Sequence, residues 1–558
     1  MTACVAVLLA LPASAVAQGP FNPPTGDLFA LGFGLGQTVV ALPVQHNPEP
    51  PLTATPLVPC GPGSVEQPGI DGRVPAGSAT NGLHCNAEAI GHEGNAGGFR
   101  VWRYVDAAGH ECAFYDTALV YPSNAFNTGG GSNGVEVLDM SDPTHPVKTA
   151  TLTELPMLSP HESVNFNEKR GLIAAVSGEA ATAPGFVSIY DASQDCRHPV
   201  LQSTTASAQL GHESGFSMDG KTFYAASTAF PSVTAVDVTD PKAPHPIWVG
   251  QVFSHGLSLS DDGNRAYIAD AADGVLTILD TSEIQARKPD PQVRQVSQLS
   301  WDSVSIPQNA IPFTEHGHPY VLEFDEYAHL TAGNFDQVGA ARIIDIADER
   351  TPRVVANLRL KVNQTDEHIA AGSDPGAGQP AQGYGAHYCN IPTRVDPKVV
   401  ACSFIVSGLR VFDISKITEP KEIAYYVAPT ISAPENFGQA SDYAMSQPQI
   451  IPSRREIWYS DATSGFYVLR VSKAVWPTAG GSSSSTCSRR FKKRFSVQKG
   501  THIRRVKARF GAKRLTARVK GRTIRVRGRR PTARTRLRLT VTQRNGHRTT
   551  RTRIIRPC

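Results

Sequence analysis

One sequence unit returns along the chain: an apolar strand ends in Asp, Ser or Thr often follows, and a turn that usually contains Pro closes the unit. In the clearest stretch, residues 255–280, short apolar runs alternate with turns that contain Gly and Asp, which is typical of β-strands joined by hairpins. The copies are 43 to 68 residues apart, a spacing that suits a four-stranded blade with its loops. Their marker residues are Asp139, Asp191, Asp237, Asp280, Asp345 and Asp413, with Arg470 in a seventh, degenerate copy.

These copies resemble the LVIVD repeat, and residues 255–270 also resemble the YVTN-type propeller repeat. The resemblance covers residues 90–476 and implies an all-β fold, a β-propeller most simply of seven blades stacked around an axis. We therefore assign residues 81–476 to the propeller and the Pro- and Gly-rich residues 18–80 to an irregular lead-in that can supply one strand. A carboxylate at a strand end before Ser or Thr is expected to accept backbone N–H bonds, so the marker Asp residues are interpreted as scaffold.

The N-terminus predicts export. Residues 1–17 have the apolar run and the Ala-x-Ala site of a signal peptide, although the positively charged first region is missing. No later segment has the length of apolar sequence that a transmembrane helix needs, so no membrane span is expected. We expect a secreted protein, either extracellular or associated with the cell envelope.

The cysteine count agrees with export, because eight of the nine cysteines follow the signal and an even number favours disulfides. Cys389 and Cys402 flank a predicted hairpin turn and are expected to bridge adjacent strands. Three pairings stay open for the other cysteines of the first 486 residues, which are Cys60, Cys85, Cys112 and Cys196.

The charge of the chain is divided. Residues 487–558 carry 27 of the 54 Lys and Arg residues and none of the 49 Asp and Glu residues, which leaves a net charge of −22 on residues 1–486. A Gly- and Ser-rich linker, residues 477–486, separates the two regions. Alternating apolar and basic residues predict a small β-sandwich-like domain, closed by a disulfide between Cys487 and Cys558. In composition and pattern it resembles the basic β modules that end many exported actinobacterial proteins.

A domain of this charge is expected to bind polyanions and to lose affinity as salt rises. Its three aromatic residues, Phe491, Phe495 and Phe510, are too few for a base-stacking platform, so no nucleic acid is expected. The leading hypothesis is that an anionic envelope polymer retains the domain at the cell surface. The propeller would then act as a binding or scaffolding module for a protein partner or for a small ligand in its channel. The alternative is intramolecular docking of the basic domain on the acidic body.

A set of histidines recurs in phase with the blades, each at the start of the first strand of a repeat, and Gln447 takes this place in the last blade. Because the first strand of a propeller blade is innermost, the side chains are expected to meet at the mouth of the central channel. Imidazole suits copper, zinc, iron and nickel. The arrangement is similar to the histidine ring of copper-binding propeller enzymes of the selenium-binding (methanethiol oxidase) family. The candidate metal ligands are His161, His212, His255, His316, His318 and His387.

Three functions stay open. The histidines can make structural hydrogen bonds around a water-filled channel, as in a scaffolding module, or they can hold copper or zinc in a metal-dependent oxidoreductase. A lactonase-like hydrolase is suggested only by the YVTN-like blade.

Two carboxylate patterns extend the metal hypothesis. His161 and Glu162 are adjacent, so strand alternation predicts that they cannot easily chelate one ion, whereas a Glu of one blade can orient a His of another. The acidic cluster of Glu323, Asp325 and Glu326, with His318 beside it, offers oxygen ligands for Ca²⁺, but a solvated strand and turn is the more common explanation of such a cluster and is favoured here.

Overall fold

The computed structural model describes residues 36–117, 134–178, 183–228, 230–327, 337–374, 383–430, 443–477, 490–497, 502–511, 513–529 and 535–555. The predicted signal peptide (1–17), residues 478–486 of the predicted linker and the predicted Cys487–Cys558 disulfide lie outside these residues. The chain divides into two compact units, Met1–Pro477 and Thr478–Cys558.

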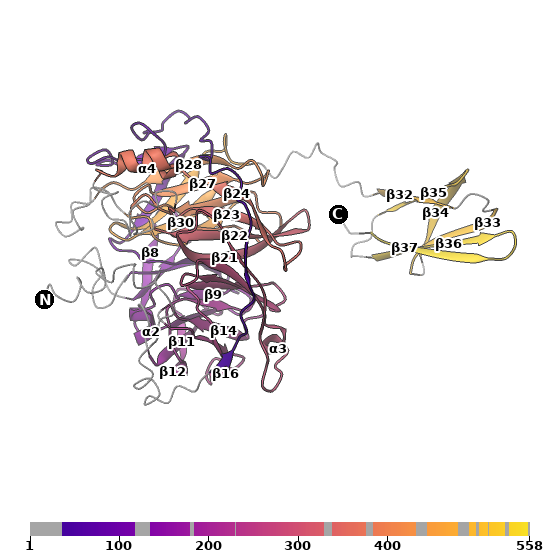
Figure 1. Cartoon of the computed structure of the whole chain (residues 1–558), viewed down its shortest axis with the longest axis horizontal. Helices are drawn as coiled ribbons and strands as arrows, with labels where there is room; N and C mark the ends of the chain where they lie inside the picture. Colours follow the sequence, from indigo (N-terminus) through magenta and orange to yellow (C-terminus); the bar gives the residue numbers. More distant parts are fainter. Residues whose placement is uncertain are drawn as a thin grey trace. The chain divides into compact units, whose positions relative to one another are not determined.

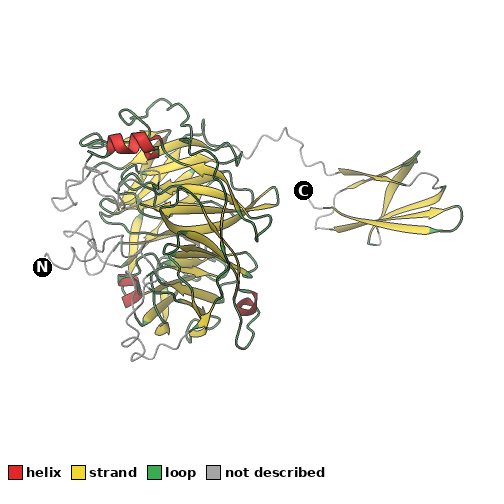
Figure 2. Ribbon diagram, viewed as in Figure 1, coloured by secondary structure: helices red, strands yellow, loops and turns green. Residues whose placement is uncertain are grey.

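In the described part of the first unit, seven blades of four antiparallel strands form a β-propeller, as predicted, and in six of them the four strands follow one another along the chain. Figures 1 and 2 show that this unit is built mostly from strands. The blades are blade 1 (β5 Val101–Val105, β6 Glu111–Asp116, β7 Val135–Asp139, β8 Val147–Leu152), blade 2 (β9 Asn165–Asn167, β10 Leu172–Val176, β11 Gly185–Asp191, β12 Val200–Ala208), blade 3 (β13 Ser214–Phe216, β14 Thr222–Ala226, β15 Val233–Asp237, β16 His245–Gln251), blade 4 (β17 Gly256–Leu259, β18 Arg265–Asp270, β19 Val275–Asp280, β20 Arg294–Ser300), blade 5 (β21 Ile306–Glu315, β22 His318–Glu326, β23 Ala341–Asp345, β24 Arg353–Leu358), blade 6 (β25 Cys389–Asn390, β26 Val399–Ser403, β27 Leu409–Asp413, β28 Lys421–Val427) and blade 7 (β29 Gln449–Ile451, β30 Glu456–Asp461, β31 Gly465–Val471, with β4 Ala87–Glu93).

Blade 7 closes the ring, because its outer strand β4 comes from the N-terminal side of blade 1 and pairs antiparallel with β31. The lead-in supplies more than the single strand expected of it. β1 (Gln37–Thr38) extends blade 3 and β2 (Val44–His46) extends blade 4, each parallel to the outer strand of that blade. β3 (Leu83–Cys85) extends blade 6. Residues 37–93 therefore follow the outer edges of successive blades before they complete the last one.

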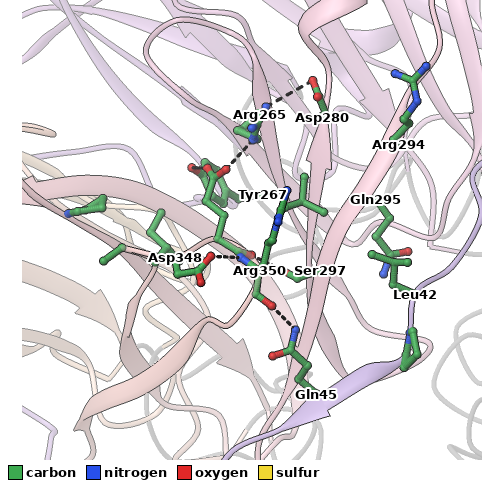
Figure 3. Close-up of a pocket in the computed structure, with 16 residues that line it drawn as sticks. Leu42, Gln45, Arg265, Tyr267, Asp280, Arg294, Gln295, Ser297, Asp348 and Arg350 are labelled. Atoms are coloured by element: carbon green, nitrogen blue, oxygen red, sulfur yellow. Dashed lines mark hydrogen bonds and ion pairs between the residues drawn. The ribbon is translucent and has the colours of Figure 1, made fainter.

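A cavity of about 970 Å³ lies where β2 passes blades 4 and 5 (Figure 3). Among its lining residues, Arg265 lies 3.4 Å from Asp280 and 2.8 Å from Glu349, and the amide of Gln45 donates to the backbone carbonyl of Arg350 at 2.5 Å. The Arg265–Glu349 pair joins blade 4 to blade 5, and the Gln45 bond joins the lead-in to blade 5, so these contacts hold the fold together.

The repeated Asp residues are scaffold, as predicted. In all six copies one carboxylate oxygen accepts the backbone N–H two residues later, at 2.7 to 3.0 Å. Every blade also has a register shift between its third and fourth strands, a bulge that increases the local twist. The Asp turn and the bulge together thus shape the outer half of six blades, and blade 7, with Arg470 in place of the Asp, has the bulge alone.

The hydrophobic core is divided among the seven interfaces between neighbouring blades, each filled by one cluster of buried apolar side chains. Between blades 2 and 3, for example, Ile189 packs in one cluster with Phe223 and Val236. A single blade cannot bury both of its faces, so closure of the ring completes the core. Helical segments are short: α2 (Leu155–Leu158), α3 (Ser282–Gln285), η3 (Lys361–Asn363) and α4 (Thr365–Ala371).

Three disulfides join described residues. Cys389 and Cys402 are direct neighbours on β25 and β26, which confirms the predicted bridge. The pairing that sequence left open is Cys60–Cys85 and Cys112–Cys196. No described helix is long and apolar enough to span a membrane.

The second unit is β-sandwich-like, as predicted. Its strands pair in the order β32-β35-β34-β33-β36-β37, and their apolar faces share one core that includes Phe491, Ile524 and Leu539. The strands are β32 (Arg490–Ser496), β33 (Ile503–Phe510), β34 (Lys513–Lys520), β35 (Thr523–Arg529), β36 (Thr535–Gln543) and β37 (Arg548–Ile555).

Candidate metal centre

The first strand of each blade lies at the inner edge of its sheet, so the residues that precede these strands meet near the propeller axis. Parallel bridges join such residues across blades, Glu162 with Glu213 and Arg100 with Gln447. Four of the predicted histidines come together here, from blades 2, 3, 4 and 6: His161, His212, His255 and His387.

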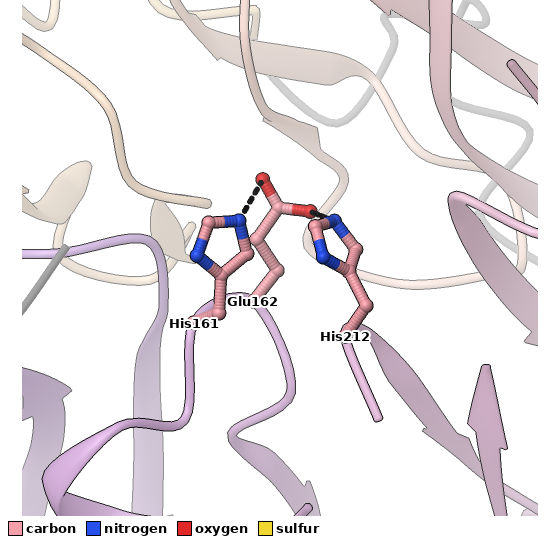
Figure 4. A group of neighbouring side chains, drawn as sticks. All are labelled: His161, Glu162 and His212. Carbon is pink, nitrogen blue, oxygen red and sulfur yellow. Dashed lines mark ion pairs between the residues drawn. The ribbon is translucent and has the colours of Figure 1, made fainter. Parts of the chain in front are cut away.

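The carboxylate of Glu162 lies among the four imidazoles, and Figure 4 shows it between those of His161 and His212. Its Oε2 atom is 3.3 Å from Nε2 of His212 and 3.5 Å from Nε2 of His255. Its Oε1 atom is 3.2 Å from Nε2 of His387 and 4.0 Å from Nε2 of His161. Every one of these contacts uses the same ring nitrogen, so the imidazoles share one orientation toward the carboxylate.

Backbone carbonyls of the next blade fix two of the rings. Nδ1 of His255 lies 2.8 Å from the carbonyl of Pro307, and Nδ1 of His387 lies 2.6 Å from the carbonyl of Met445. A carbonyl only accepts, so each Nδ1 carries the proton that it donates. In the neutral ring this leaves the Nε2 lone pair directed at the carboxylates, which is the tautomer that a metal-binding histidine needs.

Blade 5 supplies a second carboxylate and an amide. Glu326, at the end of β22, lies 3.0 Å from Nε2 of His387 and 3.5 Å from Nε2 of His255. Gln308, on β21, donates to Oε2 of Glu162 at 2.7 Å. Except for His161, whose side chain is 16 % exposed, the titratable side chains of this cluster are at most 7 % exposed.

An ion pair lies beside the cluster. The guanidinium of Arg100 pairs with the buried carboxylate of Glu213, donates through Nε to the carbonyl of Glu162 at 2.8 Å and stacks on the ring of Tyr388 at 4.4 Å. Gln447 accepts from the same guanidinium. With neutral imidazoles and ionised carboxylates, Arg100 offsets only one of three negative charges, those of Glu162, Glu213 and Glu326.

The remaining negative charge changes the proton affinity of the cluster. Desolvation lowers the pKa of His255, but Glu326 and Glu162 outweigh it and raise that pKa to about 10. For His387, hydrogen bonds to Glu162 and Glu326 outweigh desolvation and raise the pKa to about 9. Burial raises the pKa of Glu213 to about 8 despite Arg100. The site therefore attracts cations, whether protons or a metal ion.

The ring spacing suits a shared ion. Two imidazoles bound through Nε2 at about 2.0–2.1 Å and about 90–109° apart have ring centres about 4.5–5.2 Å apart. The ring centres of His161 and His212 are 4.4 Å apart, and those of His212 and His255 are 5.2 Å apart. The ligand atoms of His161, Glu162 and His212 lie within 4.8 Å of one another, as do those of Glu162, Glu326 and His387.

His316 and His318 do not join this cluster. His316 lies in the turn between β21 and β22 with its side chain 81 % exposed, next to Glu315. Nε2 of His318 donates to a carboxylate oxygen of Asp345 in the same blade, at 2.9 Å. The prediction that blade 5 adds a histidine to the axis was wrong, because β21 is ten residues long and places the segment around His316 at its far end.

Two predictions about carboxylates also need correction. His161 and Glu162 do not alternate as on a strand, because β9 begins only at Asn165 and His161 has a positive φ of 49°. This turn lets both side chains reach the cluster. The acidic cluster of blade 5, expected as a solvated turn with Ca²⁺ binding as the alternative, is buried: Arg342 pairs with Glu323 and Asp325, and Glu326 faces the imidazoles.

A cavity of about 760 Å³ is lined by residues of the innermost strands of all seven blades. It lies toward the C-terminal ends of these strands, whereas the imidazoles precede their N-terminal ends. Arg100, Asn309 and Gln447 line it, and the first two contact Glu213 beside the imidazole cluster. The candidate centre therefore lies behind a polar layer at the inner end of an open channel.

Fold and site together define the class: a seven-bladed β-propeller with buried imidazoles and carboxylates near its axis, followed by a basic β-sandwich-like unit.

No protein-family model matches the chain, and no curated protein sequence matches it. Among solved structures, the periplasmic gluconolactonase of Pseudomonas aeruginosa is 13 % identical with a TM-score of 0.41, over 77 % of this chain and 93 % of that one. A chain of the hydrazine synthase of Kuenenia stuttgartiensis is 13 % identical with a TM-score of 0.42, over 69 % and 97 %. A chain of a mitotic checkpoint complex is 12 % identical with a TM-score of 0.41, over 69 % and 94 %. Likenesses at this level say nothing about the chemistry of this chain.

Proposed function

We propose that this protein is an exported propeller that binds one divalent transition-metal ion through Nε2 of His161, His212, His255 and His387, with Glu162 as a further ligand. The observation that carries the proposal is the common orientation of the imidazoles: Nε2 faces the Glu162 carboxylate in all four, at 3.2 to 4.0 Å. The disulfides support an exported protein.

The donor set favours copper, zinc, iron or nickel, the ions that imidazole suits. A divalent ion would also offset the two negative charges that Arg100 leaves when the three carboxylates are ionised. Glu326 would accept hydrogen bonds or neutralise charge beside the ligands, as carboxylates near metal-bound histidines do.

Oxidoreductase activity depends on the ion that the site takes. Copper or iron would support electron transfer, whereas zinc would support only binding or polarisation of a bound group. The channel that ends at Arg100 and Asn309 would then admit the reactant.

The competing function is a scaffolding module whose buried cluster holds protons instead of a metal. His255 and His387 donate hydrogen bonds to the carbonyls of Pro307 and Met445 in the next blade. These bonds link neighbouring blades, so they support a scaffolding role as well as they support a metal site. The two functions differ in what the purified protein contains.

Metal content separates them. Full-length protein, purified and then exposed in turn to copper, zinc, iron and nickel before removal of the excess, is expected to retain about one ion per chain by elemental mass spectrometry. The double variant His212→Ala/His255→Ala should lose it. The matched double variant His316→Ala/His318→Ala, which also removes two imidazoles, should keep it. Substoichiometric metal after all four ions, or equal loss in both variants, would overturn the proposal.

A further inference from the structure

The second unit carries a cationic face on the sheet formed by β34, β33, β36 and β37. Along β33 the residues alternate: Ala508 and Phe510 are buried in the core, whereas Arg505 and Arg509 are exposed and Lys507 is partly exposed between them. Side chains at alternate positions of a strand share a face, so these three basic residues point away from the core together.

Strand register extends this face sideways. Arg509 lies directly opposite Arg514 on β34 and opposite Arg538 on β36, so three guanidinium groups form one row across adjacent strands. In a parallel row, Arg505 pairs with Thr542, which in turn pairs with Arg548 on β37. We define the cationic face as Arg505, Lys507, Arg509, Arg514, Arg538 and Arg548.

Like charges directly opposite each other destabilise a sheet. The same repulsion lowers the pKa of Lys507: Arg505 has the largest effect, followed by desolvation and then by Arg509, Arg548 and Arg514. Residues 487–558 contain no Asp or Glu, so no carboxylate side chain of this unit offsets the repulsion. The counter-charge must come from outside the unit.

The spacing of the basic residues and the burial of the aromatic side chains restrict the class of ligand that this face can bind. Neighbouring strands are about 4.8 Å apart and alternate residues on a strand about 6.8 Å apart, so the face is a regular grid of cations rather than a pocket for one anion. The aromatic side chains of the unit, Phe491, Phe495 and Phe510, are between 5 and 9 % exposed in the core. The face therefore offers charge without rings on which bases stack.

We propose that the cationic face binds an extended, base-free phosphodiester polymer of the poly(glycerol phosphate) type. Such a chain carries phosphates at regular intervals along a flexible backbone and can follow the row of Arg514, Arg509 and Arg538. Binding releases counterions, so affinity falls linearly with the logarithm of salt concentration. This inference does not depend on the metal site, which lies in the other unit.

The test uses the full-length protein and poly(glycerol phosphate) immobilised on a sensor surface, over a series of salt concentrations. The face variant is Arg505→Thr/Lys507→Thr/Arg509→Thr, because Thr suits a strand. The matched control is Lys493→Thr/Arg551→Thr/Arg553→Thr, which removes the same charge. Its three residues pair with Val526, Leu539 and Leu537 and so lie on the core side of their sheets.

The face variant is expected to bind more than tenfold more weakly. The slope of log affinity against log salt concentration should become less steep by about 2, because each of the three lost phosphate contacts contributes about 0.7 to that slope. The control should lose less than threefold. Amide hydrogen exchange in β36 would confirm that both variants keep the sheet. Equal losses of affinity in the two variants would overturn the proposal that the polymer binds at the cationic face. Tighter binding to a polynucleotide of equal phosphate number would overturn the base-free ligand, and tighter binding to phosphatidylglycerol vesicles would overturn the polymer.

Discussion

The Oε1 atom of Glu162 lies 3.2 Å from Nε2 of His387, whose opposite nitrogen already donates its proton to a carbonyl. Two acceptors do not remain at this distance in a buried site unless a cation, either a proton or a metal ion, lies between or beside them. The hydrogen bonds of His212 and His255 hold the pKa of Glu162 well below its usual range against the opposing effect of burial, so this carboxylate is the permanent anion of the cluster.

Replacing that anion tests its part in metal binding. Glu162→Gln keeps the shape of the side chain but removes its charge, so we expect the metal to bind about 10- to 100-fold more weakly. Isothermal titration of the apo-protein measures the change. The exposed Glu168→Gln in the same blade serves as the control, and an unchanged affinity in Glu162→Gln would remove Glu162 from the ligand set.

Asp270, at the end of β18, gives a prediction about stability and pH. Burial raises its pKa to about 7, although backbone N–H groups of Asp273 and Ala272 oppose the shift. The folded pKa lies above the unfolded value of about 3.9, so the folded state holds this proton more tightly. The contribution to stability is present below about pH 4 and is lost as the pH rises to about 7.

Asp270→Asn is therefore expected to raise the free energy of unfolding by about 2 to 4 kcal/mol at pH 8 and by little at pH 4. Asn can still accept the N–H bonds of Ala272 and Asp273. Urea unfolding at the two pH values measures the difference. The exposed Asp290→Asn should change neither value, and a gain of equal size at both pH values would contradict the assignment.

At the scale of elements, the ring depends on β4, which carries the N-terminal side of the propeller into blade 7. Gly91 on β4 lies against blade 1: a Cβ atom there would meet the carbonyl oxygen of Pro143 at 2.2 Å. This close approach explains why the strand that closes the ring has a residue without a side chain at its contact with the next blade.

Gly91→Val is expected to lower the free energy of unfolding by about 1–3 kcal/mol, because the added side chain overpacks the junction of blades 7 and 1. Ala89→Val, an exposed position on the same strand, should have little effect. Chemical unfolding of both variants checks this. Equal free energies of unfolding for the two variants would contradict this prediction, because β4 could then shift to accommodate a side chain at residue 91 without loss of stability.

The repeat predicted the elements because six of the seven blades are local units, in which about 50 consecutive residues contain both the Asp turn and all four strands. Blade 7 is the exception, because its outer strand β4 comes from the N-terminal side of blade 1. The site was predicted only in part. The four converging histidines each lie just before the first strand of their blade, as the repeat predicts. In blade 5 the ten-residue β21 separates His316 and His318 from that position and places them away from the axis. Glu326 and Arg100 could not be found in this way, because only closure of the ring brings them to the imidazoles.

The whole molecule combines two units of opposite character. The first has its core divided among seven blade interfaces, whereas the second has one small core under sheets whose formal charges are all positive. In the second unit repulsion between Lys and Arg side chains opposes folding, and salt screens it.

Raising NaCl from about 20 to about 300 mM, which shortens the screening length severalfold, should therefore increase protection of the second unit against amide hydrogen exchange. The described propeller core should change less, because both signs of charge are present in that unit. Exchange read separately in β36 and in β18 checks this. Unchanged or reduced protection in β36 would contradict the claim that repulsion among Lys and Arg side chains destabilises the second unit.

The central claim is that one ion lies among imidazoles from four blades, and anomalous diffraction tests it most directly. A crystal of the protein loaded with copper or zinc, measured at the absorption edge of that metal, should show one strong peak about 2.0–2.2 Å from Nε2 of His212 and His255. Diffraction from a fully loaded crystal with no peak there, and with Glu162 still in contact with the imidazoles, would contradict the account.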